Sequence, residues 1–198
     1  MTVVRIGEQE RERRSSLLQR RATPLTVVLV VAAIAALRLW AVETVIVEGH
    51  SMVGMLEPGD RVLVIKMLQA KRLDVVVLED PSAGGPVIKR LIGMPGDTIS
   101  MTPYTVRRGN QVFTLGSQLY IDGAPQDEAY ATSLVPVSMP PIQMGDDEYF
   151  VAGDNRDASI DSRRYGPVGG QQMIGVGVAV IYPLTRARLI GRPSALQE

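Results

Sequence analysis

Beyond residue 41, the regular patterns in this 198-residue chain are short runs rich in β-branched residues, separated by turn residues. Runs of this kind, bounded by glycine, proline and aspartate, are typical of β-strands. They occupy residues 61–67 (RVLVIKM), 74–78 (DVVVL), 86–93 (PVIKRLIG), 148–154 (EYFVAGD) and 175–183 (GVGVAVIYP). We find no convincing helical pattern after residue 41, so the sequence predicts a mainly β fold for residues 42–198.

Residues 101–145 interrupt this series of strands. They carry polar residues, glycines and the proline-rich sequence VPVSMPP at 135–141. We expect an inserted lobe or long loops in this stretch, within a single domain that runs from residue 42 to residue 198.

The N-terminal part of the chain has a different character. Residues 25–41 are apolar apart from Arg38, and at 1.5 Å per residue a helix of this length spans roughly 25 Å, slightly less than a hydrocarbon core of about 30 Å. The preceding residues 1–23 carry six arginines and three glutamates, which predicts a cytoplasmic N-terminus by the positive-inside rule. We therefore expect a basic tail over 1–23, one transmembrane anchor over 24–41 and an extracytoplasmic domain over 42–198. A buried core helix and a cleaved secretory signal remain alternatives for the apolar segment.

The composition excludes several classes of function. The chain has no cysteine and a single histidine, His50, so it can form no disulfide, thiol nucleophile or multi-histidine metal site. Residues 24–198 carry 15 basic and 18 acidic side chains, and a folded domain that binds nucleic acid is normally basic. We expect no cofactor, no metal and no nucleic-acid partner.

A serine and a lysine stand out as candidates for catalysis. Ser51 follows a short β-branched run, and Lys89 comes 38 residues later in a chain that has 18 arginines but only three lysines. A desolvated lysine can lose its proton, whereas arginine stays charged in proteins. Within residues 86–93, Val87, Lys89 and Leu91 share one face of a strand, and an apolar environment on that face would lower the lysine pKa. Serine with neutral lysine is a known alternative to the Ser-His-Asp triad.

His50 is a poor base for Ser51 because adjacent residues of an extended chain point to opposite sides.

A polar run, GDNRDASIDSR at residues 153–163, supplies the groups that could support such a pair. Its acids and arginines can form ion pairs, and Ser159 offers a hydroxyl that could orient an amine. A solvated loop is the alternative for a charge run of this kind.

Taken together, the apolar segment, SM at Ser51, GDRVLV at Gly59, IKRLIGMPGD at Ile88, LYIDG at Leu119 and the run at 153–163 resemble the type I signal peptidases. The resemblance covers roughly residues 24–191, and the short serine-to-lysine spacing is similar to that of the compact, single-anchor members. It implies an antiparallel β catalytic domain with a coiled sheet and a small β insert. It also implies a membrane-bound serine endopeptidase that removes signal peptides from secretory precursors through an acyl-enzyme.

By this resemblance Ser51 is the nucleophile and Lys89 the general base. The supporting residues would be Ser159, Asp161, Arg163, Arg90 and Asp154. The sequence departs from the family pattern at Gly54 and Met55, where Pro-Thr is usual, and Gly49 replaces a serine that some members use as an oxyanion donor. The backbone N–H of Ser51 is then the obvious oxyanion donor.

The same resemblance implies substrates with small residues at the first and third positions before the cut. Two shallow apolar pockets under an extended strand would read these two positions. Our candidates for the pocket walls are Val47, Met52, Val87 and Ile88. The other expected partner is the membrane lipid around the anchor, with the catalytic domain on the outer face of the cell membrane.

Two other functions remain possible from the sequence. One is a catalytically silent, membrane-tethered binding domain, and the other is a specialised peptidase dedicated to one pilin or conjugation precursor. A self-cleaving repressor with Ser-Lys chemistry would need an N-terminal DNA-binding helical domain, and the charged tail and anchor leave no room for one.

Overall fold

The computed structural model describes residues 26–36, 40–133 and 135–193, and the chain divides into two compact units, Met1–Ala41 and Val42–Glu198. In the first unit, residues 26–36 and 40–41 are helical, and the side chains of residues 26–36 are exposed. Among the described residues, no helix has the length and apolar character needed to cross a membrane. The predicted basic tail at 1–23 and Arg38 lie outside the described residues, so the predicted anchor over 24–41 is only partly described.

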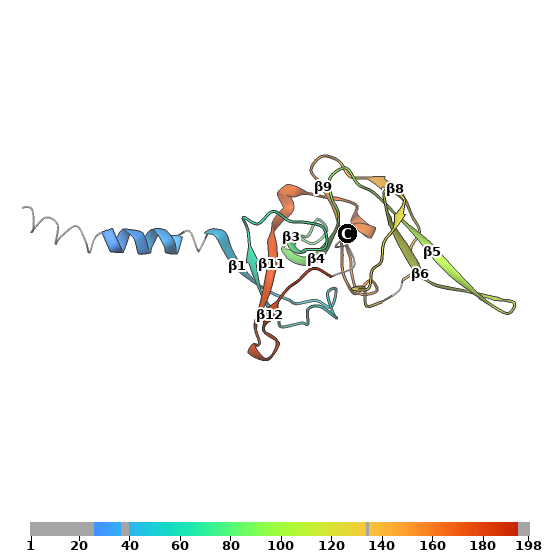
Figure 1. Cartoon of the computed structure of the whole chain (residues 1–198), viewed down its shortest axis with the longest axis horizontal. Helices are drawn as coiled ribbons and strands as arrows, with labels where there is room; N and C mark the ends of the chain where they lie inside the picture. The colour runs from blue at the N-terminus through green and yellow to red at the C-terminus, as the bar shows by residue number, and fades with distance from the viewer. Residues whose placement is uncertain (1–25, 37–39, 134, 194–198) are drawn as a thin grey trace, which may run out of the picture. The chain divides into compact units, whose positions relative to one another are not determined.

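The second unit is built from antiparallel strands, as the sequence predicts (Figure 1). Its main sheet has the order β1-β2-β11-β3-β4-β9-β10 within the described residues, and β12 pairs with β11. The strands are β1 (Val42–Ile46), β2 (Arg61–Ile65), β3 (Val75–Glu79), β4 (Pro86–Gly93), β9 (Glu148–Ala152), β10 (Val168–Gly169), β11 (Met173–Tyr182) and β12 (Arg188–Leu189). The short helical segments of this unit are α2 (Ser162–Tyr165), η1 (Gly170–Gln172) and η2 (Leu184–Arg186).

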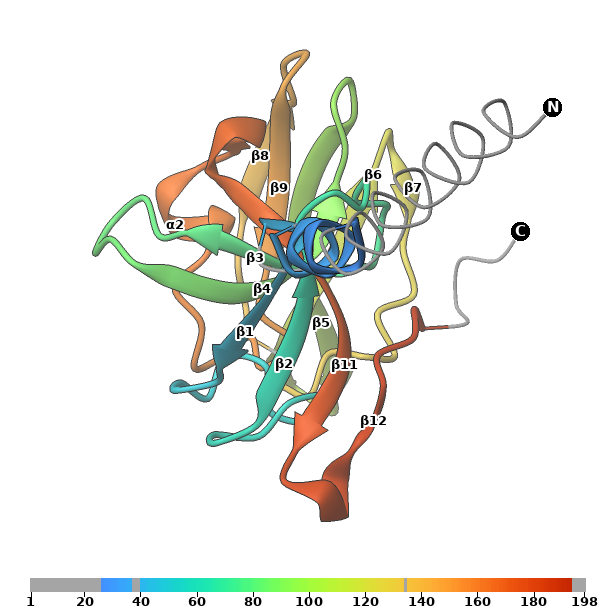
Figure 2. The same ribbon diagram turned by 90° about the vertical axis from the view of Figure 1, so that its left-hand side faces the viewer.

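The main sheet curls along β11, where two irregularities occur in its pairing with β2. Figure 2 shows β1, β2 and β11 side by side on this curled part of the sheet. Extra residues in one strand increase its local twist and bend it. Glycine is required in this strand because a Cβ on Gly175 would lie 2.7 Å from the Ile65 carbonyl oxygen.

A second sheet follows the order β7-β6-β5-β8 and comprises β5 (Thr98–Arg108), β6 (Gln111–Ile121), β7 (Ala124–Pro125) and β8 (Met139–Gln143). For residues 101–145 the sequence predicts an inserted lobe or long loops, and the structure has a separate β lobe there, in which β5 and β6 form a hairpin whose outer end extends beyond the rest of the domain (Figure 1). That outer end is exposed on both faces, so the sequence carries no core-facing alternation there. The turn at Gly109 and Asn110, with Gly109 at φ 62°, is the signal that could have identified the hairpin.

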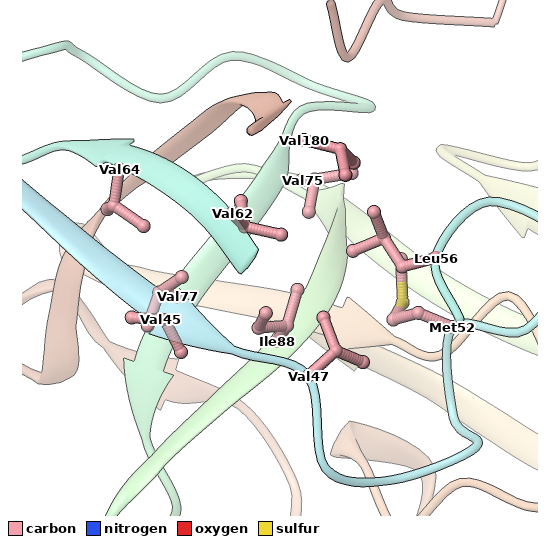
Figure 3. Packing of buried hydrophobic residues seen from close by; sticks show 10 residues of the cluster. All are labelled: Val45, Val47, Met52, Leu56, Val62, Val64, Val75, Val77, Ile88 and Val180. Carbon is pink, nitrogen blue, oxygen red and sulfur yellow. The ribbon is translucent and has the colours of Figure 1, made fainter. Parts of the chain in front are cut away.

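Strand β4 lies at the centre of the core and contributes to three hydrophobic clusters. Ile88 packs with Val47, Met52 and Leu56 in the first cluster (Figure 3). Val87 and Leu91 belong to the cluster with Val76 and Val151, on the face that also carries Lys89. Ile92 packs with residues of the second sheet, including Ile99 and Leu119. Because both faces of β4 are covered, polar side chains on this strand are removed from water.

The most deeply buried polar contact of the fold lies on β4. Arg90 Nε donates to Asp154 Oδ1 at 2.6 Å, and Arg90 Nη2 pairs with Asp154 Oδ2. Arg90 Nη1 donates to the Leu73 carbonyl oxygen at 2.9 Å, and the side chains of Arg90 and Asp154 are 0% and 1% exposed. The pair therefore ties the loop after β9 to the middle of β4.

We predict that Asp154→Asn lowers the free energy of unfolding by about 3–5 kcal/mol, because it leaves the Arg90 charge buried without its partner. Urea unfolding of the full chain in detergent measures the change. The matched control is Glu43→Gln, which breaks an ion pair with Lys66 whose side chains are 42% and 39% exposed, and which should change the stability by less than about 1 kcal/mol. Equal effects of the two substitutions would contradict a structural role for the buried pair.

Candidate active site

Ser51 lies in the turn that follows β1. Two buried apolar side chains of this turn and hydrogen bonds from Asn155 hold it in place. Met52 and Leu56 beneath the turn are 1% and 0% exposed, and the Leu56 N–H donates to the Met52 carbonyl at 2.7 Å. The Ser51 carbonyl oxygen accepts the Asn155 N–H at 2.9 Å, and the Asn155 side chain donates to the His50 carbonyl at 3.2 Å. These contacts place Ser51, which is half-buried, directly against the 153–163 loop.

Lys89 is buried, with 5% of its surface exposed, between Val87 and Leu91 on one face of β4. This face of β4 points inward, which is the condition under which the sequence favours a lowered lysine pKa. Desolvation lowers the pKa of Lys89, and the charges of Asp161 and Asp80 oppose that shift, while the charge of Arg163 adds to it. Within the described residues Lys89 forms no ion pair, so its charged form is poorly compensated.

Gly153 is the contact point between the Ser51 loop and Ser159. A Cβ on Gly153 would lie 2.5 Å from the Ser51 carbonyl oxygen and 2.4 Å from Ser159 Oγ. Both serines therefore approach Gly153 more closely than any side chain there would allow. Ser159 Oγ is buried and has no hydrogen-bond partner within the described residues, which is uncommon for a buried hydroxyl.

Asp161 and Arg163 form a buried ion pair within the 153–163 loop. Asp161 accepts the Gly153 N–H at 2.9 Å and pairs with Arg163, whose Nε and Nη2 lie 2.8 Å from its two carboxylate oxygens. Burial would raise the pKa of Asp161, but the hydrogen bonds and charge of Arg163, with a smaller contribution from the Gly153 N–H, hold it below its usual value. Arg163 also donates to the Arg156 carbonyl at 2.9 Å, which closes the loop on itself.

The structure thus brings together most of the residues singled out from the sequence. Ser51, Ser159 and Asp161 all contact Gly153, and the charge of Asp161 acts on Lys89. The supporting pair of Arg90 and Asp154 lies on the other face of β4 from Lys89.

The four residues that we predicted as pocket walls form part of the core. Val47, Met52 and Ile88 are 5%, 1% and 7% exposed and pack together in the first cluster (Figure 3), while Val87 is half-buried. A cavity of about 450 Å³ lies elsewhere, on the side of the second sheet, where Glu128, Ser133, Arg156 and Arg163 contribute to its walls. No group of three or more His, Asp or Glu side chains in the described part of the chain could hold a metal ion.

The sequence analysis missed two groups near the site. Asp80, in the turn after β3, acts electrostatically on Lys89, and its own carboxylate is held by Ser82. Residues 128–133 contact the Ser51 loop and the 153–163 loop through Thr132 and Ser133. The Asp-Pro-Ser sequence that begins at Asp80 is typical of a turn and could have identified this residue. No local pattern could have identified residues 128–133, because their contacts are with residues distant in sequence.

Comparison with known proteins gives a consistent result. The family described as "Signal peptidase, peptidase S26" matches residues 20–182. Signal peptidase I P of Bacillus subtilis subsp. natto is 34% identical over 159 residues, which cover 76% of this chain and 83% of that protein. Signal peptidase I of Leptolyngbya laminosa is 30% identical over 180 residues, which cover 85% of this chain and 82% of the relative. A crystal structure of a signal peptidase I from Enterococcus faecalis is 28% identical and covers 55% of this chain and 97% of its own, with a TM-score of 0.40.

These matches define the protein as a hydrolase that cleaves peptide bonds. The chain belongs to the signal peptidases of peptidase family S26, and its enzymatic class is signal peptidase I.

We predict that Gly153→Ala reduces kcat/KM by about 10²-fold or more, because the new methyl group forces the Ser51 carbonyl and the Ser159 side chain apart. Cleavage of a precursor protein by the purified variant measures the effect. Gly191→Ala is the control, since a Cβ at that position meets no atom within 4 Å, and it should leave the rate unchanged. Full activity of Gly153→Ala would contradict the close contact.

A second prediction concerns stability and pH. The pKa of Lys89 is lower in the folded protein than in the unfolded chain, so between these two values the unfolded state binds more protons and the free energy of unfolding rises with pH. Lys89→Met should remove this rise and should make the protein more stable than the parent at neutral pH. The control is Lys71→Met at an exposed position, and unfolding by urea from pH 6 to pH 10 measures both. A Lys89→Met variant that is less stable than the parent at neutral pH would contradict the poorly compensated charge.

Proposed function

We propose that Ser51 and Lys89 form the catalytic dyad of a membrane-bound endopeptidase that removes signal peptides from secreted precursor proteins. The observation that carries the proposal is the buried Lys89, which has no ion-pair partner within the described residues and a pKa below its ordinary value. Such an amine can be neutral near physiological pH and can accept the proton of a serine hydroxyl.

In the proposed reaction, Lys89 Nζ takes the proton from Ser51 Oγ as this oxygen attacks the carbonyl carbon of the scissile peptide bond. The carbonyl oxygen becomes an oxyanion that accepts the Ser51 backbone N–H, which donates no hydrogen bond within the described residues. The C–N bond then breaks, and the leaving amine takes the proton from Lys89. Lys89 next removes a proton from a water molecule as the water oxygen attacks the ester carbon. The bond from this carbon to Ser51 Oγ then breaks, and Ser51 Oγ takes the proton back from Lys89, which restores the neutral amine and the serine hydroxyl.

The supporting groups have distinct parts in this proposal. The unpartnered Ser159 hydroxyl is the group that would orient the neutral Lys89 amine. Arg163 pairs with Asp161 and offsets part of the charge that would otherwise favour the charged form of Lys89. Arg90 and Asp154 hold β4 and the 153–163 loop together beneath the site.

The arrangement of the strands favours an extended substrate. Within the described residues, β9 pairs with β4 only from Arg90 onward, and β1 pairs on one side only, with β2. Residues 86–89 and β1 therefore each present an unpaired edge, and a precursor segment could add to such an edge as a strand. Ile88, Val87, Val47 and Met52 would then lie under the residues before the cut and restrict them to small side chains.

Membrane attachment remains part of the proposal, with one anchor over 24–41, a cytoplasmic N-terminus and the catalytic domain on the outer face. Its support is the apolar character of residues 25–41 and the arginine-rich tail before them. The domain also exposes large apolar side chains on β1, on β12 and in the segments that follow β2 and β11. These are Ile46, Met67, Leu68, Leu184 and Leu189, which are 50%, 62%, 47%, 82% and 83% exposed. Contact with lipid would remove this surface from water.

We predict that Ser51→Ala and Lys89→Arg each lower kcat/KM by about 10³-fold or more, and that the double variant is no worse than either. Lys89→Arg keeps the charge but cannot accept a proton. In the parent protein, kcat/KM should rise with pH through a pKa below about 10.4, the value of an exposed lysine. The assay is cleavage of a precursor by the full chain in detergent, and Lys71→Arg is the control that should remain fully active. An active Lys89→Arg variant would exclude Lys89 as the base.

A further inference from the structure

An irregular segment between β7 and β8 contacts two parts of the proposed active site. We call residues 128–133, which lie between β7 and β8, the bridging segment. Its Thr132 N–H donates to the Asp154 carbonyl at 2.9 Å, and Thr132 Oγ1 donates to the Val53 carbonyl at 3.2 Å. Thr132 Cγ2 also packs on Gly54, where a Cβ would lie only 2.3 Å away. The segment is therefore in direct contact with both the Ser51 loop and the 153–163 loop.

Tyr130, in the middle of the bridging segment, lies between two arginines. Its ring centroid is 4.8 Å from the Arg90 guanidinium carbon and 5.9 Å from that of Arg156. Cations at this distance are attracted by the electron-rich face of the ring, more strongly when the contact is removed from water. The side chain of Arg156 is 6% exposed, and that of Arg90 is 0% exposed.

The hydroxyl of Tyr130 is also fixed. It donates to Glu128 Oε1 at 2.9 Å, and the Glu128 carboxylate pairs with Arg156, whose Nη1 donates to Oε2 at 3.1 Å. Burial, followed by the charge of Glu128, raises the pKa of the Tyr130 hydroxyl, so this group stays protonated and remains a donor. Tyr130 is thus restrained at its ring by two cations and at its hydroxyl by one carboxylate.

The two arginines bind neighbouring residues at the start of the 153–163 loop. Arg90 holds the Asp154 carboxylate, and Arg156 Nε donates to the Gly153 carbonyl at 2.9 Å. Gly153 is the residue on which the Ser51 carbonyl and the Ser159 hydroxyl both pack. A displacement of Tyr130 would therefore move both guanidinium groups. Because these groups bind Gly153 and Asp154, the movement would alter the alignment of the two serines.

We propose that Tyr130 is a positioning residue for catalysis, which fixes Gly153 and Asp154 through Arg90 and Arg156 and thereby aligns Ser51 with Lys89. The inference rests on the proposed Ser51–Lys89 chemistry. Tyr130 packs against the hydrophobic cluster that includes Ile92 and Phe150, whereas β1 and residues 86–89 contribute their apolar side chains to the other two clusters. Its removal should therefore slow the chemical step and leave substrate binding unchanged.

The test separates kcat from KM for a precursor peptide, with the full chain in detergent. Tyr130→Leu should lower kcat by about 10- to 100-fold, as expected for a small misplacement of reacting groups, with KM within about twofold of the parent. Tyr130→Phe keeps the ring between the arginines and should recover most of the activity. Tyr120→Leu is the matched control, because Tyr120 is a half-buried tyrosine of β6 that pairs with Pro125 of β7, and it should leave kcat unchanged.

Three outcomes would overturn the positioning role: an unchanged kcat for Tyr130→Leu, an equal loss for Tyr120→Leu, or a loss that appears in KM alone. Should Tyr130→Leu fail to fold, Glu128→Gln provides the test, because it weakens the restraint on Arg156 and should lower kcat by about tenfold with KM unchanged. Ser51→Ala measured alongside distinguishes the two proposals. If the parent activity does not depend on Ser51, the dyad is wrong, whereas dependence on Ser51 with an unchanged Tyr130→Leu contradicts only the role of Tyr130.

Discussion

The buried ion pair between Arg90 and Asp154 is the interaction on which the rest of the site depends. Neighbouring residues of a strand point to opposite faces, so β4 presents Arg90 to the Asp154 side and Lys89 to the other. The pair fixes the 153–163 loop to the same strand that carries the lysine. One strand therefore supplies a permanent cation for structure and a titratable amine for the proposed chemistry, and we expect an exchange of the two residue types to abolish both.

The electrostatic balance around Lys89 depends on the way in which Asp161 is paired. Burial lowers the pKa of Lys89, and the charge of a nearby carboxylate opposes that shift. Arg163 holds both oxygens of Asp161, so the carboxylate can fix the Gly153 N–H while most of its charge is compensated. The Asp161 carboxylate is thus held in place near Lys89, and the Arg163 charge offsets part of its effect on the lysine.

The sequence was sufficient to predict β4 with its observed bounds, Pro86–Gly93, because its β-branched and apolar residues are buried on both faces. The same reasoning missed the outer half of the β5–β6 hairpin, where exposed side chains give no core-facing pattern. It could not pair Arg90 with Asp154, 64 residues away, or place Tyr130 between two arginines, because such contacts depend on the tertiary fold. The proposed nucleophile and base came from residue chemistry and family resemblance, and their roles remain predictions.

Direct titration of the Lys89 amine is the most stringent measurement of the central claim, that this lysine is neutral enough to act as a base. The chain has only three lysines, so selective isotope labelling gives three amine signals, and Lys66→Arg and Lys71→Arg variants assign them in the spectrum. Nuclear magnetic resonance of the full chain in detergent micelles, followed over pH, yields the pKa of Lys89 itself. The structure predicts a midpoint for Lys89 clearly below about 10.4. A midpoint at or above the value of an exposed lysine would contradict the proposed mechanism.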